Sequence, residues 1–122
     1  MRKTIAVLAA LALLPVVAAH ASTDDDPPVT KAATRTITLG DNFFKPKTIT
    51  VRKGTILKFN WGPDNSGTLD LHNVTGVSGN KFDSTEDTTK PDKPFKKRFT
   101  KNSLVVCTIH STTMKLRVKI KK

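Results

Sequence analysis

Apolar and polar residues alternate along most of the sequence after Arg35, and this pattern constrains the fold more than any other feature. Within residues 36–39, isoleucine and leucine point to one side and two threonines to the other, which is typical of a half-buried strand. The predicted strands are residues 36–39, 48–51, 57–61, 71–75, 97–100, 104–107 and 115–120. Loops rich in Gly, Pro, Asp and Asn separate them, and no stretch has a useful helical periodicity. The pattern predicts an all-β fold, an antiparallel sandwich of two sheets.

The first 21 residues have the pattern of a secretory signal peptide. A charged start at Arg2 and Lys3 precedes an apolar core at residues 5–19 and an Ala-His-Ala cleavage sequence at residues 19–21. The apolar core is shorter than the roughly 20 residues that a membrane span needs. Residues 22–34, with three aspartates and two prolines, predict a flexible linker, and residues 35–122 predict one domain. We therefore expect an exported protein, in the periplasm or in the extracellular space and cell envelope.

Cleavage after Ala21 would leave a strongly basic domain with a single cysteine. The formal net charge would fall from +11 to +9, which favours anionic partners or surfaces. In an exported protein, an acidic redox partner, anionic lipid or a cell-wall polymer is a better expectation than nucleic acid. One cysteine cannot form an internal disulfide, so the thiol is expected either to pair with another molecule or to be reactive or ligating.

Cleavage would also reduce the soft and borderline metal ligands to one small set. His20 and Met1 would leave with the leader. The remaining ligands are His72, Cys107, His110 and Met114. Two imidazoles, one thiolate and a weak axial thioether are what a type 1 copper site requires.

Taken singly, each of these side chains has an ordinary explanation as a core or surface residue, but their joint order favours copper. Cys107 ends an apolar strand, His110 and Met114 follow in the next turn, and His72 comes from a neighbouring strand. Zinc could use the same groups. Structural zinc prefers more than one thiolate, however, and catalytic zinc rarely uses methionine.

The spacing of the apolar and ligand residues resembles that of the plastocyanin-like cupredoxins over residues 35–122. The matching residues are Phe44, Pro46, Ile49, Val51, Gly54, Leu57, Phe59, Trp61, His72, Asn73, Phe82, Asp83, Ser84, Cys107, Thr108, His110 and Met114. The resemblance implies a two-sheet Greek-key β-sandwich with one copper ion. It also implies equatorial ligation by His72, Cys107 and His110, axial ligation by Met114, and an Asn73 that ties the two ligand loops together near Thr108. The loop between His110 and Met114 departs from the family because it lacks proline and glycine.

The leading hypothesis is an electron carrier that uses Cu(I) and Cu(II) and is not an enzyme. Electrons would pass through His110, among the neutral residues 111–113, to an acidic partner such as a cytochrome or a copper or haem oxidoreductase. A basic stripe formed by Lys115, Arg117, Lys119 and Lys121 would orient that partner. The domain is expected to act as a monomer, and peripheral contact with an anionic membrane or cell-wall surface is a further expectation. The alternative is an exported copper carrier that delivers the ion to a cuproenzyme.

Overall fold

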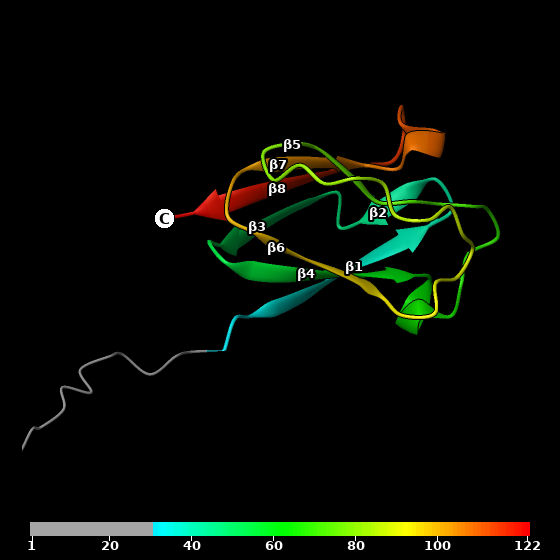
Figure 1. Cartoon of the computed structure of the whole chain (residues 1–122), viewed down its shortest axis with the longest axis horizontal. Coiled ribbons are helices and arrows are strands. Elements are labelled where there is room, and N and C mark those ends of the chain that lie inside the picture. The colour runs from blue at the N-terminus through cyan, green and yellow to red at the C-terminus, as the bar shows by residue number, and fades with distance from the viewer. Residues whose placement is uncertain (1–30) are drawn as a thin grey trace, which may run out of the picture. The chain divides into compact units, whose positions relative to one another are not determined.

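The structure is a computed structural model that describes residues 31–122. The predicted signal peptide and the linker up to Thr30 lie outside the described residues. Eight strands in residues 31–122 form two four-stranded sheets (Figure 1). They are β1 Thr34–Gly40, β2 Phe43–Lys45, β3 Thr48–Arg52, β4 Thr55–Trp61, β5 Thr75–Ser78, β6 Phe95–Phe99, β7 Ser103–Val106 and β8 Lys115–Lys121. Two short 3₁₀ helices, η1 Pro63–Asn65 and η2 Thr108–His110, lie in loops. Between Lys31 and Lys122 there is no helix long and apolar enough to cross a membrane.

The two sheets are mixed, so the expectation of a purely antiparallel sandwich is wrong in this respect. One sheet has the order β2-β1-β4-β6 and the other β3-β8-β7-β5. β1 pairs with β4 in parallel, and β3 pairs with β8 in parallel, while the other pairings are antiparallel. Parallel neighbours require a crossover connection, and here the chain crosses to the opposite sheet between the two members of each pair. The all-β, two-sheet architecture is confirmed.

The core lies between the sheets and contains the alternating apolar residues that the sequence indicated. Ile37 and Leu39 of β1, for example, have no exposed surface. Leu116 and Val118 of β8 are buried in the same core, and Ile120 packs against it. The basic side chains that alternate with them on β8 are exposed, so the stripe exists as predicted. Phe82 and Phe95, which are partly buried, also pack against this core.

β5 is displaced from its predicted position. The sequence predicted a strand at residues 71–75, but the strand spans Thr75–Ser78 and pairs with β7. His72 forms only an isolated bridge with Thr88. β5 does not show the alternation of apolar and polar residues because its buried position is occupied by Gly76. A Cβ added at Gly76 would lie 2.4 Å from the ring of Phe82. The phenylalanine ring therefore fills the space that an apolar strand residue would occupy.

Candidate metal centre

Cys107 stands where β7 passes into η2. Its backbone is still extended, with φ −93° and ψ 120°, and its side chain has no exposed surface. The backbone N–H of Cys107 donates to the carbonyl of Met114 at 3.2 Å. This bond holds the end of β7 against the start of β8. Because a buried strand end fixes the direction of its side chain, the thiol points into the space between the ligand loops.

His110 returns to the thiol because η2 turns the chain immediately after Cys107. The N–H of His110 donates to the carbonyl of Cys107 at 3.1 Å, which closes this turn. As a result, His110 Nδ1 lies 3.8 Å from Cys107 Sγ. His110 is partly exposed, and Ser111, Thr112 and Thr113, which follow it, are exposed.

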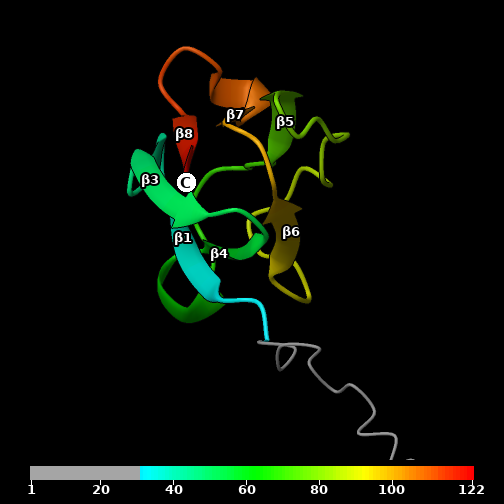
Figure 2. The ribbon, with the colours of Figure 1, turned by 90° about the vertical axis from the view of Figure 1, so that its left-hand side faces the viewer.

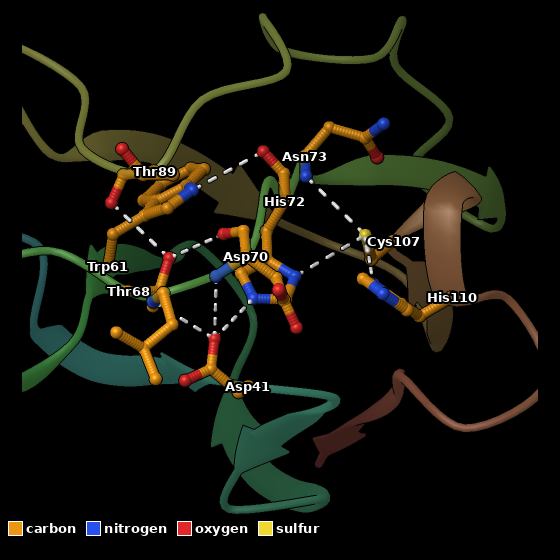
Figure 3. A network of polar contacts seen from close by, with 10 residues as sticks. Asp41, Trp61, Thr68, Asp70, His72, Asn73, Thr89, Cys107 and His110 are labelled. Carbon is orange, nitrogen blue, oxygen red and sulfur yellow. Dashed lines mark hydrogen bonds and ion pairs between the residues drawn. The ribbon is translucent and has the colours of Figure 1, made fainter.

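His72 reaches the same point from the opposite ligand loop (Figure 3). Its ring is completely buried, and its Nδ1 lies 3.9 Å from Cys107 Sγ. Two backbone hydrogen bonds with Thr88, at 3.0 and 3.1 Å, fix its main chain. The indole N–H of Trp61 also donates to the His72 carbonyl at 3.3 Å. The centroids of the two histidine rings are 5.1 Å apart.

The three ligand atoms fit a single metal ion. The potential ligand atoms of His72, Cys107 and His110 all lie within 4.8 Å of one another. Bonds of about 2.0–2.3 Å from one ion, separated by angles of about 120°, place nitrogen and sulfur about 3.7 Å apart. The observed separations of 3.8 and 3.9 Å are close to this value. The chain thus brings together three of the four predicted ligands in a geometry that suits near-trigonal N₂S coordination.

Met114, the fourth predicted ligand, lies beside these residues in the buried core. Its side chain has no exposed surface and belongs to the same apolar cluster as Cys107. Its carbonyl accepts from Cys107, and its N–H donates to the carbonyl of His110 at 2.8 Å. The residue is therefore tied by its backbone to two of the other three predicted ligands.

A carboxylate that the sequence did not indicate orients His72. Asp41 Oδ1 lies 3.3 Å from His72 Nε2, the ring nitrogen that faces away from the thiol (Figure 3). The same oxygen accepts the backbone N–H groups of Asp70 at 3.0 Å and Leu69 at 3.1 Å. Hydrogen bonding from the Asp70 N–H, followed by that from His72 and Leu69, lowers the pKa of Asp41, although desolvation opposes the shift. A carboxylate on the distal nitrogen is a common way to fix the orientation of a metal-binding imidazole.

Asn73 joins the two ligand loops, as the family resemblance implied. Its Nδ2 donates to Thr108 Oγ1 at 2.7 Å, and its Oδ1 accepts the Thr108 N–H at 3.0 Å. Its own backbone N–H lies 3.5 Å from Cys107 Sγ and donates to it. Asn73 also donates to Asp87 at 2.7 Å. One buried side chain therefore fixes the distance between the loop of His72 and the loop of Cys107 and His110.

No protein-family model matches the sequence, and no curated protein matches it. The structure is similar to solved structures of pseudoazurins and amicyanins. The pseudoazurin of Hyphomicrobium denitrificans is 17% identical, with a TM-score of 0.55, and the match covers 74% of this chain and 77% of that one. The pseudoazurin of Methylobacterium extorquens AM1 is 19% identical, with a TM-score of 0.52 and coverage of 73% and 76%. An amicyanin variant with Cu(I) is 15% identical, with a TM-score of 0.52 and coverage of 73% and 83%. At these identities the similarity establishes the cupredoxin-like fold of the domain.

Proposed function

We propose that this protein is an exported type 1 copper protein that transfers single electrons between redox partners. The observation that carries the proposal is the convergence of His72 Nδ1 and His110 Nδ1 on the Cys107 thiol, at 3.9 and 3.8 Å. His72, Cys107 and His110 would be the equatorial ligands of one copper ion and Met114 its axial ligand. A thiolate, two imidazoles and a weak thioether together suit copper better than zinc or a hard cation.

The architecture around the ligands supports electron transfer rather than chemistry on a substrate. The ligand atoms already lie together on loops that backbone hydrogen bonds fix, so a change of oxidation state would need little movement. Copper supplies the Cu(I)/Cu(II) couple when bound, and the hydrogen bonds around the thiolate and the imidazoles tune it. Residues 31–122 contain only two histidines, both in this site, so they offer no second copper cluster for an oxidase. We infer that the protein is not an enzyme.

His110 would be the route for electrons because it is the only histidine of the site with exposed surface. Leu71 and Ile109, each adjacent in sequence to one ligand histidine, are 51% and 43% exposed. These apolar side chains would contact a partner around the ring edge. Lys115, the first residue of the exposed basic stripe on β8, directly follows Met114 and would attract an acidic partner to this end of a monomeric domain.

We also propose export, which rests on the leader-like pattern of residues 1–21. On this proposal, residues 22–34 form a linker to the folded domain. The mature protein would operate in the periplasm or at the outer face of the cell envelope.

The visible spectrum of the copper-loaded protein tests the electron-transfer proposal. A type 1 site should give intense thiolate-to-copper absorption in the Cu(II) form, and Cys107→Ser should abolish it. An unmodified protein that binds Cu(II) without this absorption would contradict the proposal. Survival of the absorption in Cys107→Ser would also contradict it.

The partial exposure of His110 favours one alternative, a carrier that delivers copper to a cuproenzyme. A solvent-accessible ligand offers an acceptor protein a place to begin ligand exchange. Rapid electron self-exchange with tightly held copper would support the electron carrier. Fast loss of Cu(I) to a competing thiolate chelator would instead support the copper carrier.

A further inference from the structure

A cleft of about 170 Å³ lies at the end of the sandwich opposite the ligand loops, where β1 begins and β3 and β8 end. Figure 2 looks onto this end of the domain, with the final residues of β8 in red beside β3 and β1. Arg35, Arg52 and Lys121 line the cleft, together with the hydroxyl-bearing residues Thr50 and Thr55. No acidic residue lines it.

The strand pairing places the cationic side chains together. Arg52 and Lys121 are direct partners in the parallel pairing of β3 with β8. Strands in such a pair lie about 4.8 Å apart, so the two side chains leave the sheet on the same face as close neighbours. Arg35 comes from β1, in the opposite sheet, and contributes a third cation from the other side of the cleft.

These cations have no partner within residues 31–122. None of the three forms an ion pair with a carboxylate there, and neither arginine side chain donates a hydrogen bond to a described residue. Arg98, which lies near the same end, differs because its guanidinium donates to the Gly54 carbonyl at 3.0 Å. Like charges held together without a counter-charge repel one another, and a bound anion relieves that repulsion.

We propose that this cleft binds one phosphate-type oxyanion. Two guanidinium groups can each offer paired N–H donors to phosphate oxygens, and the lysine ammonium adds a third positive charge. A volume of about 170 Å³ suits a compact tetrahedral anion better than an extended acidic segment. The phosphate belongs either to a free anion or to the headgroup of an anionic phospholipid, because both present the same oxygens.

The cleft is separate from the metal centre. Lys121, which lines the cleft, lies seven positions after Met114 along β8, which corresponds to about 23 Å of extended chain. An anion bound there would leave His110 and the residues around it free. If the phosphate is a lipid headgroup, the domain would therefore bind the membrane with its metal end directed away from the surface.

The site is tested by following backbone amides by NMR while sodium phosphate replaces sodium chloride at constant ionic strength. We expect saturable shifts at residues of the cleft and none in the ligand loops. The double variant Arg52→Gln/Lys121→Gln should weaken phosphate binding at least tenfold. Lys58→Gln/Lys96→Gln is the matched control, because these residues are direct partners on the other sheet and their replacement removes the same number of charges.

The two variants separate a specific site from a general effect of charge. Equal weakening in both variants, or the absence of saturable shifts at the cleft, would overturn the proposal. If the double variant at the cleft does not fold, as judged by its amide spectrum, Arg35→Gln tests the same site from another strand.

Vesicles distinguish the two sources of phosphate. Sedimentation with phosphatidylcholine vesicles that contain phosphatidylglycerol should be reduced only in the cleft variant if the ligand is a lipid headgroup. If both variants sediment equally with the vesicles while the cleft variant alone loses its binding of inorganic phosphate, the ligand is the free anion. Either result supports the site and identifies its source of phosphate.

Discussion

Replacing Asn73 by alanine should weaken the metal centre more than it weakens the fold. Asn73 is 1% exposed and makes two hydrogen bonds to Thr108, at 2.7 and 3.0 Å. It also accepts from Thr75 Oγ1 at 3.1 Å and donates to Asp87 at 2.7 Å. The replacement removes the side-chain hydrogen bonds that tie the loop of His72 to Thr108, the residue after Cys107.

The size of the effect follows from these bonds. A hydrogen bond contributes about 0.5–1.5 kcal/mol net, so the loss of these four bonds should lower the free energy of unfolding of the metal-free protein by about 2–6 kcal/mol. Loss of an orienting contact near a metal typically lowers metal affinity about 10- to 100-fold. Since copper stabilises the folded state in proportion to the logarithm of its affinity, the copper-loaded variant should lose about a further 1.4–2.7 kcal/mol.

Asn80 offers a control with the same chemistry at another place. Its Oδ1 accepts the Thr100 N–H at 2.8 Å, and its Nδ2 donates to Thr100 Oγ1 at 3.1 Å, as Asn73 does with Thr108. Asn80 also contacts Ser103, at the end of β7 opposite Cys107. Asn80→Ala should therefore destabilise the metal-free and copper-loaded proteins equally.

Urea unfolding of both variants, with and without copper, measures these differences directly. Visible absorption under copper-limiting conditions gives the affinities independently. The reasoning would be refuted if Asn73→Ala lost the same free energy with and without copper. Equal copper affinity in the two variants would refute it as well.

Three other substitutions test separate contacts. Asp41→Asn should lower copper affinity about 10- to 100-fold, measured by competition with a chelator, because it weakens the orientation of the His72 ring. The pKa of Asp41 lies below its ordinary value of 3.8, so the carboxylate stabilises the fold above that pH, and this stabilisation is lost as the pH falls further. The free energy of unfolding of Asp41→Asn, measured as the pH is lowered, should not show this loss. Met114→Leu should cost less than about 1.5 kcal/mol of folding free energy, since the volume is kept. It should retain the absorption and raise the reduction potential, measured by voltammetry, because Cu(II) would lose an axial donor. Gly76→Ala should destabilise the protein by about 1–3 kcal/mol in thermal unfolding, because the added Cβ meets the ring of Phe82.

Much of the fold could be predicted because the alternation of apolar and polar residues determines which side of each strand is buried. On β8, Leu116 and Val118 are buried as expected, and the basic residues that alternate with them are exposed. The alternation contains no information about the direction of the neighbouring strand, so it could not predict that β8 pairs in parallel with β3. It also failed at β5, where a glycine and a distant phenylalanine share one position of the core.

The sequence indicated those parts of the metal centre that depend on contacts between residues close together in the chain, and it missed a part that depends on a distant contact. Cys107 and His110 come together within one turn of chain, so their spacing alone suggests a shared ligand site. Asp41 lies 31 residues from His72 and follows β1 in a segment where aspartate is an ordinary turn residue. Its role depends on the β1–β2 hairpin, which belongs to the sheet that contains neither Cys107 nor the start of β8. Cys107, His110 and Met114 are thus supplied by one sheet and its loops, whereas His72 lies on the connection between the two sheets, and its orientation requires both sheets to be folded together.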